Sequence, residues 1–239
     1  LLLLVILRKM GLGERIAVPL VLFFLAIYVL ATGWRWSVIR ASIMMGTGLV
    51  GALVKKDKSP YTSLSLAIII ILLISPWALF DVGFQLSFIA TLSIMIFSPI
   101  VFNKSDGPLI WNWFRAGISI SLAAQIGTAP LVAYYFNQIS FISPIANLII
   151  SPLVAISIQL GFLAYFLGVL ILPLGMAINA ANELILALII KASRFFSLIP
   201  FAWCYVGTPS HFFLFIYYAI LFWIYAGSLH THIFKREDF

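Results

Sequence analysis

Length, composition and charge together exclude a soluble globular domain for this sequence. Of its 239 residues, 64% are hydrophobic and only 9% are charged, and the mean hydropathy is +1.16. Such values are typical of an integral membrane protein. Because a helix needs roughly 20 apolar residues to cross about 30 Å of hydrocarbon, the length predicts an all-α, polytopic transmembrane helical bundle of about seven to nine membrane segments.

The two ends and the cysteine content add further expectations. The first residue is Leu, and the apolar run 1–7 is too short to cross a membrane, so we expect residues 1–239 to be a single transmembrane domain of a longer chain. Cys204 is the only cysteine, which excludes an internal disulfide and a thiolate metal cluster. We therefore expect neither a metal site nor a cofactor.

Apolar stretches bounded by charged residues, Gly or Pro predict the membrane segments in chain order. The expected segments are 16–32, 38–54, 62–75, 82–101, 116–135, 144–170, 175–199 and 209–229. Two places look broken or re-entrant. Ser75-Pro76-Trp77 ends a segment of only about 14 apolar residues, and 137–152 carries Asn, Gln, Ser and Pro between apolar flanks.

Most basic residues fall on one side of the membrane if the segments alternate strictly. The positive-inside rule predicts that this side is cytoplasmic. The residues concerned are Arg8, Lys9, Arg15, Lys55, Lys56, Lys58, Lys104, Arg115, Lys235 and Arg236. Arg35, Arg40, Lys191 and Arg194 lie nearer the opposite side, where snorkelling at helix ends is the ordinary role.

The run Asp81-Val82-Gly83-Phe84-Gln85-Leu86-Ser87-Phe88 is the most informative polar feature. A carboxylate near the centre of a spanning helix costs about 2.5–3.5 kcal/mol, so it usually faces a bundle interior or a watery path. Asp81 and Gln85 are four residues apart and share a helical face, and Gly83 permits close approach of another backbone. Two roles for Asp81 stay open, an N-terminal helix cap and a functional carboxylate.

Arg40 opens the second segment and is followed by Gly46, Gly48 and Gly51, which are suited to close helix packing. Its position on the side of Asp81 allows two interpretations besides snorkelling. The two side chains could form an ion pair, or they could together line an entrance.

The later segments carry two further polar features. Ser121, Gln125 and Thr128 form one stripe, which either joins helices or, with Asn147, lines a hydrated path. Glu183 and Arg194 lie near one face of their helix, roughly 16 Å apart along its axis, so each needs a different partner.

Motifs of soluble enzymes are missing from the sequence. It contains no Gly-x-Ser-x-Gly elbow, no His-Glu-x-x-His and no phosphate-binding glycine loop. A soluble-type hydrolase or a nucleotide-driven motor is therefore excluded, and we expect no enzymatic activity in this chain.

Several motifs, taken in order, resemble the competence domain of ComEC-type DNA-internalisation proteins. They are Arg40-Ala41-Ser42-Ile43-Met44, the run from Asp81 to Thr91, Gln125 to Pro130 with Phe136, and Pro144-Ile145-Ala146-Asn147 with Pro152. The resemblance implies a polytopic channel in the bacterial cytoplasmic membrane that passes single-stranded DNA inward during natural transformation. Its implied partners are single-stranded DNA, the lipid bilayer, other domains of the same protein and the DNA-uptake machinery.

A DNA path needs donors for phosphate and flat surfaces for bases. On this basis, the candidate donors are Arg40, Gln85, Gln125 and Asn147, and the candidate stacking rings are Phe84, Phe88 and Phe136. The polar or structural intramembrane candidates are Asp81, Gly83, Ser87, Glu183 and Arg194.

Two other functions remain open for these residues. The main alternative is a secondary transporter of a small solute, with Asp81 or Glu183 as its proton or cation site. In a purely structural scaffold, the polar stripes would serve only to join helices.

Overall fold

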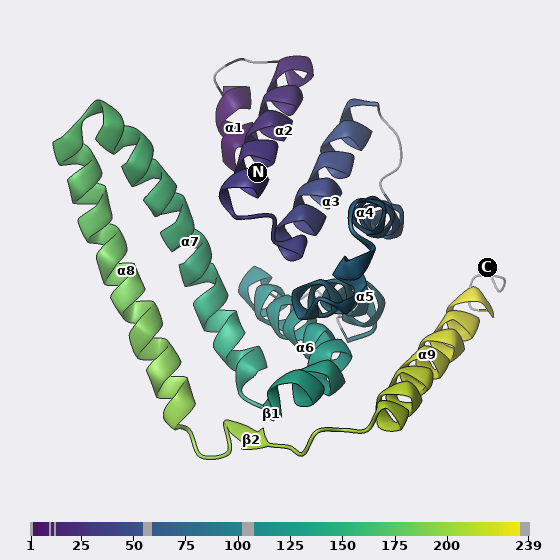
Figure 1. Cartoon of the computed structure of the whole chain (residues 1–239). Helices are drawn as coiled ribbons and strands as arrows, with labels where there is room; N and C mark the ends of the chain where they lie inside the picture. Colours follow the sequence, from purple (N-terminus) through teal and green to yellow (C-terminus); the bar gives the residue numbers. More distant parts are fainter. Residues whose placement is uncertain (1, 10, 12, 55–58, 102–107, 235–239) are drawn as a thin grey trace. The chain divides into compact units, whose positions relative to one another are not determined.

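The computed structural model describes residues 2–9, 11, 13–54, 59–101 and 108–234 (Figure 1). The basic residues Lys55, Lys56, Lys58, Lys104, Lys235 and Arg236 lie outside these ranges. The chain divides into two compact units, Leu1–Met95 and Ile96–Phe239, and we describe each by itself.

Nearly all of the described chain is helical. The helices are α1 (Leu2–Lys9), α2 (Glu14–Ala31), α3 (Trp36–Leu53), α4 (Pro60–Ile74), α5 (Val82–Val101), α6 (Leu109–Phe136), α7 (Ser143–Leu170), α8 (Leu172–Leu198) and α9 (His211–Phe234). Helices α2 to α9 match the eight expected segments, which confirms the all-α, polytopic prediction. Within the described residues, six helices are long and apolar enough to cross a membrane: α2, α3, α5, α6, α7 and α8.

The first expected break is confirmed. Helix α4 ends at Ile74, and a 3-10 helix, η1 (Pro76–Phe80), leads into α5. A proline at the start of η1 fits this change, because its nitrogen has no hydrogen to continue the α4 hydrogen-bond pattern.

The second expected break is shorter than predicted. Helix α6 ends at Phe136. Asn137 caps it in a left-handed backbone conformation (φ 55°) that asparagine adopts readily, and a short strand, β1 (Gln138–Ser140), follows. Helix α7 then runs through both Pro144 and Pro152. Pro144 lies in the first helical turn, where no intrahelical hydrogen bond is lost, and Pro152 is accommodated inside the helix.

Asp81 fixes where α5 begins. Its Oδ1 accepts a hydrogen bond of 2.8 Å from the backbone N–H of Phe84, and its backbone carbonyl accepts one from the N–H of Gln85. This geometry is that of an N-cap, in which a short acidic side chain satisfies an amide that has no partner within the helix. Of the two roles that the sequence left open for Asp81, the cap is confirmed.

Successive helices pack side by side in the first unit. Contacts join α1 to α2, α2 to α3, and α3 to α4. The main core of this unit consists of Ile39, Leu64, Ala67, Ile71, Ala78, Phe84 and Phe88. A second cluster between α1 and α2 is flanked by an exposed ion pair of 2.5 Å between Arg8 and Glu14.

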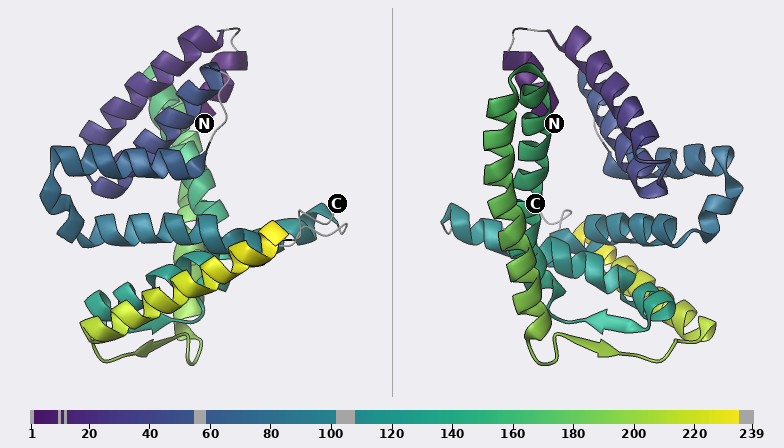
Figure 2. Two further views of the ribbon diagram at one scale, coloured as in Figure 1. Left: turned by 90° about the vertical axis from the view of Figure 1, so that its right-hand side faces the viewer. Right: turned by 60° about the vertical axis from the view of Figure 1, so that its left-hand side comes forward.

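In the second unit, two long helices form a hairpin. Helices α7 and α8 run side by side over most of their length and are joined at the single residue Ile171 (Figures 1 and 2). At its other end, α8 leads to a strand, β2 (Trp203–Tyr205), which pairs antiparallel with β1. In the register, Ile139 lies opposite Cys204. This small ribbon was not predicted, and it ties the α6–α7 connection to the α8–α9 connection.

Glycines allow the close approach of α7 and α8. A Cβ atom built on Gly175 would collide with the backbone of Gly168 on the facing helix, and it would lie 2.8 Å from the carbonyl oxygen of Ala164. In lipid, helix association depends on such close packing, because the surrounding hydrocarbon is as apolar as the side chains.

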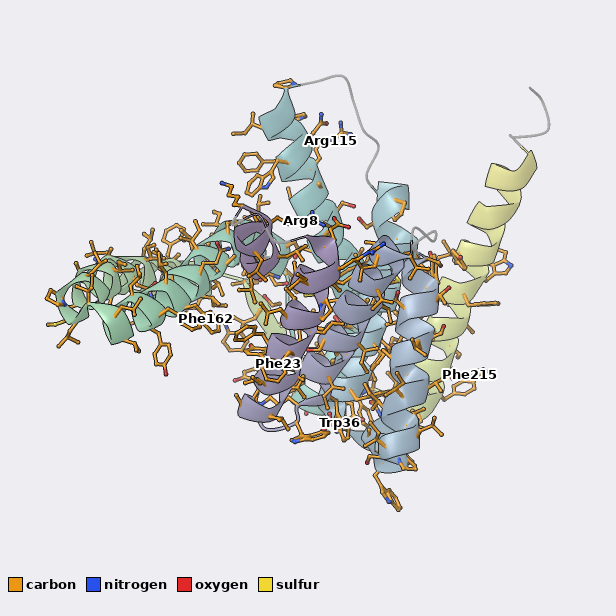
Figure 3. The ribbon with its side chains drawn as sticks, turned by 90° about the horizontal axis from the view of Figure 1, so that it is seen from above. Arg8, Phe23, Trp36, Arg115, Phe162 and Phe215 are labelled. Carbon is orange, nitrogen blue, oxygen red and sulfur yellow. The ribbon has the colours of Figure 1, made fainter. Side chains whose placement is uncertain are left out.

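Large apolar side chains cover much of the outer surface. Figure 3 shows Phe23 on α2, Phe162 on α7 and Phe215 on α9 projecting away from their helices, and they are 61%, 51% and 73% exposed. Because a soluble protein would hide such side chains, this surface fits contact with lipid.

We expect Gly175→Ala to destabilise the protein by about 1–3 kcal/mol, because the added methyl group has no space against the α7 backbone. Thermal unfolding in detergent, followed by tryptophan fluorescence, measures the effect. The matched control is Gly48→Ala, at a helical glycine whose added Cβ would meet nothing within 4 Å. Equal melting temperatures for the two variants would contradict the close packing.

We expect Asp81→Ala to cost about 1 kcal/mol of stability, whereas Asp81→Asn should retain most of it, because asparagine is an equally good N-cap. The same unfolding measurement compares the two variants. A loss in Asp81→Asn as large as that in Asp81→Ala would show that the negative charge, and not the cap, stabilises this end of α5.

Candidate functional site

The candidate residues of the first unit gather around the start of α5. Gln85, one turn after the Asp81 cap, donates a hydrogen bond of 2.9 Å from Nε2 to the carbonyl oxygen of Leu79 in η1. A Cβ atom built on Gly83 would lie 3.1 Å from the Asp81 carboxylate, so a side chain here would crowd the cap. The carbonyl oxygen of Ser87 accepts a hydrogen bond from Thr91. The Asp81 and Gln85 hydrogen bonds therefore hold the junction between η1 and α5 in place, whereas the bond between Thr91 and Ser87 lies within α5.

Phe84 and Phe88 do not have the surroundings expected of base-stacking rings. They are 4% and 6% exposed, they pack on each other with centroids 4.4 Å apart, and both belong to the main core of the unit. Neither ring presents a face to a ligand in this conformation. Their place in a DNA path stays a prediction, and their burial in one core with Ile39, Leu64 and Ile71 is evidence against it.

Arg40 lies beside this core, so its guanidinium group places a positive charge next to the buried rings. Its guanidinium carbon is 5.8 Å from the centroid of the Phe88 ring, a distance typical of a cation–π contact. Its Nε is buried and has no hydrogen-bond partner. Of the interpretations left open for Arg40, the ion pair with Asp81 does not form, and no carboxylate among the described residues is bonded to Arg40. The Arg40 guanidinium therefore contacts the Phe88 ring, and no described carboxylate neutralises its charge.

Gln125 is the centre of the polar stripe in the second unit. Its Nε2 donates a 2.5 Å hydrogen bond to the carbonyl oxygen of Ser140, and its Oε1 accepts one of 3.0 Å from the hydroxyl of Ser143. The Ser140 hydroxyl in turn donates to the carbonyl oxygen of Ala202. Both ends of the Gln125 amide are therefore used to attach the α6–α7 connection to α6.

Asn147 and Phe136 lie on either side of this connection along the chain. Asn147 is exposed and donates a hydrogen bond of 3.2 Å from Nδ2 to the hydroxyl of Ser121, so it joins α7 to α6. Phe136, at the end of α6, is 52% exposed and offers an open ring. Of the three rings proposed from the sequence, only this one is accessible.

Glu183 and Arg194 both lie exposed on α8, and neither takes part in an ion pair among the described residues. Their neighbour Asn182 behaves differently. It is buried to 6% exposure between α8 and α7, its Oδ1 has no partner, and its Nδ2 lies 3.6 Å from a Cβ built on Gly161. The structure thus separates a polar residue within the hairpin from two charged residues on its surface.

The sequence analysis missed several interhelical hydrogen bonds. The hydroxyl of the buried Ser119 donates to the carbonyl oxygen of Ser98, and the hydroxyls of Tyr217 and Tyr218 donate to carbonyl oxygens of α6. The one signal available in the sequence was Pro130, which removes a donor from α6 and so demands another. Nothing in the sequence indicated which helix would supply it.

Chemically, the two units offer different groups. The first unit offers the Arg40 guanidinium, which has no ion-pair partner among the described residues, beside a closed aromatic core. The second unit offers amide and hydroxyl groups that are mostly bonded to one another, and exposed rings that include Phe136. Among the described residues, no three His, Cys, Asp or Glu side chains are grouped so as to hold a metal ion.

Comparison with known proteins identifies the family. The family model described as Competence protein matches residues 1–230. The chain is also 37% identical over 171 residues to ComE operon protein 3 of Bacillus subtilis (strain 168), an alignment that covers 71% of this chain and 21% of that relative. No solved structure matches the chain. With a match over nearly its whole length, the chain belongs to the competence protein family.

Proposed function

We propose that this chain is the channel-forming part of a longer protein and passes single-stranded DNA inward across the bacterial cytoplasmic membrane during natural transformation. The observation that carries the proposal is the family match over residues 1–230. It is supported by six helices, among the described residues, that are long and apolar enough to span a membrane. The matched region covers about a fifth of the relative's length, so the DNA substrate and the other domains of the protein are part of the proposal.

Arg40 is the residue that we assign to phosphate. A strand moving through a membrane needs positive charge that attracts it but is not already neutralised by the protein. Arg40 meets both conditions, since the Phe88 ring holds its guanidinium and no described carboxylate pairs with it. The cation–π contact also offsets part of the free-energy cost of keeping this charge in a membrane helix.

For the second unit, we assign Phe136 to base stacking and Asn147 to hydrogen bonding with the strand. Phe136 is the accessible ring among the three candidate rings, and Asn147 is exposed beside Ser121. Stacking on aromatic rings accepts every base, which suits a channel that takes DNA of any sequence. Gln85 and Gln125 instead hold helix junctions, and we assign them a supporting role.

A second candidate function is favoured by one observation. Glu183 lies exposed near the middle of α8, without an ion-pair partner among the described residues, as a proton or cation site of a secondary transporter would. Asp81 supports this alternative less well, because its carboxylate caps α5.

We expect Arg40→Ala to lower the entry of DNA into the cytoplasm by about tenfold or more, since charge-assisted hydrogen bonds to phosphate are lost. Arg40→Lys should retain part of the activity, because the charge remains. The measurement is nuclease-protected labelled DNA per cell, normalised to the amount of protein in the membrane. Arg35→Ala, which removes an exposed cation at the start of the same helix, is the matched control. Full uptake in Arg40→Ala would contradict the assignment.

We expect Glu183→Gln and Asp81→Asn to leave DNA uptake unchanged, because a DNA channel needs neither carboxylate to carry protons. The same uptake assay, repeated over a range of external pH, tests this expectation. If either amide variant abolished transport and removed its pH dependence, the coupled-transporter alternative would replace the channel.

A further inference from the structure

Helix α6 is apolar and long enough to span a membrane, and it contains a proline; in hydrocarbon, the backbone has no water to replace a lost hydrogen bond. Pro130 lies inside α6 and has no N–H, so the carbonyl oxygen of Ile126, four residues earlier, lacks its helical donor. In a spanning helix, such a carbonyl must find a donor on a neighbouring helix, a nearby side chain or a bound water.

Helix α9 supplies that donor, and a second one beside it. The Tyr217 hydroxyl donates a hydrogen bond of 2.8 Å to the carbonyl oxygen of Ile126, and the Tyr218 hydroxyl donates one of 2.9 Å to that of Gly127. Consecutive side chains on a helix point about 100° apart, so two such bonds fix both the position and the rotation of α9. Helices α6 and α9 lie side by side (Figure 2).

The same turn of α6 also holds the α6–α7 connection. Gln125, directly before Ile126, binds Ser140 and Ser143 through its amide. Three consecutive residues of α6 therefore attach two different parts of the unit: Gln125 through its side chain, and Ile126 and Gly127 through their carbonyls. A change in the backbone at this turn would move both attachments together.

A similar arrangement occurs at a second proline. Pro99 lies inside α5, and the carbonyl oxygen four residues before it, that of Met95, accepts a hydrogen bond of 3.3 Å from the hydroxyl of Tyr61 on α4. In both helices, a tyrosine from another helix reaches the carbonyl that the proline leaves without a donor. This recurrence is evidence that the tyrosine hydroxyls replace the N–H donors that the prolines lack.

We propose that Tyr217 and Tyr218 are positioning residues, which clamp α9 onto the proline break of α6 and thereby keep the α6–α7 connection and the β1–β2 ribbon in place. The proposal concerns the packing of α9 and does not depend on what the protein transports. It assigns the phenolic hydroxyls, and not the rings alone, as the groups responsible.

A double-mutant cycle tests the pairing of tyrosine with proline. In the full-length protein, Tyr217→Phe should change the unfolding equilibrium constant by about threefold, the average effect of an interhelical hydrogen bond in a membrane protein. In a Pro130→Ala background, the same substitution should have almost no effect, because the new N–H of residue 130 serves the Ile126 carbonyl. An equal effect in both backgrounds would overturn the proposal.

The control for this cycle is Tyr165→Phe. Tyr165 is 68% exposed on α7, and no hydroxyl contact is described for it, so its loss should be small and independent of Pro130. A coupling between Tyr165 and Pro130 as large as that of Tyr217 would also contradict the proposal.

The labelling rate of Cys204 provides a local readout of the β1–β2 ribbon that is separate from the melting temperature. It lies in β2 opposite Ile139, and the following segment is tied to α6 by hydrogen bonds from the Val206 N–H to the Asn137 carbonyl and from Asn137 Nδ2 to Thr208 Oγ1 (2.8 Å). Freeing α9 should loosen this ribbon. The rate of maleimide labelling at Cys204, read by mass spectrometry of its peptide, should rise by about threefold or more in the Tyr217→Phe, Tyr218→Phe double variant.

The matched control for labelling is Gly175→Ala, which lowers stability at the distant end of α8 and should leave Cys204 labelling near the wild-type rate. An unchanged labelling rate in the double tyrosine variant would overturn the positioning role, even if the melting temperature fell. This measurement also stands without Pro130→Ala, should that variant fail to accumulate.

Discussion

The backbone groups at the breaks in the helices are the constraint on which the rest of this structure depends. In hydrocarbon, a carbonyl or amide that loses its helical partner has no water to replace it, so each break must be matched by a donor or acceptor within the protein. Asp81 accepts a hydrogen bond from an amide in the first turn of α5, and Gln125 donates one to the connection after α6. Tyr61 and Tyr217 donate to carbonyl oxygens that lack a helical donor because of a proline. The polar side chains of this apolar chain are therefore used mainly where the helices are interrupted.

This use of polar groups changes the interpretation of the run from Asp81 to Phe88. Its residues are distinctive enough to suggest a site, yet the cap, the contact of Gln85 with Leu79 and the burial of both phenylalanines give it a structural task. Arg40 rests on this assembly through the Phe88 ring. The run thus builds a rigid support, and the charge that we assign to phosphate is carried by the neighbouring helix.

Sequence alone predicted the helices well and the side-chain partners poorly. Apolar length locates a membrane helix because the hydrocarbon thickness is fixed, and Ser75-Pro76 marks a break because proline lacks an N–H. Asp81 was recognisable as a cap because its acceptor acts on the next turn of the same chain. The burial of Phe84 was not predictable, since Leu64 and Ile71 reach it from another helix. The same is true of Tyr217, which bonds a residue 91 positions away.

The α7–α8 hairpin has a consequence for how the protein enters the membrane. Its turn is formed by Leu170, Ile171 and Leu172, all of them exposed and apolar, and the sequence has no charged residue between Arg115 and Glu183. Insertion of this pair would therefore carry no ionised group across with its tip, which removes the main energetic barrier to translocation. The uncharged stretch between Arg115 and Glu183 also contains no cation that could set its orientation in the membrane. Its orientation therefore depends on the flanking cations, Arg115 before the hairpin and Lys191 and Arg194 near the end of α8.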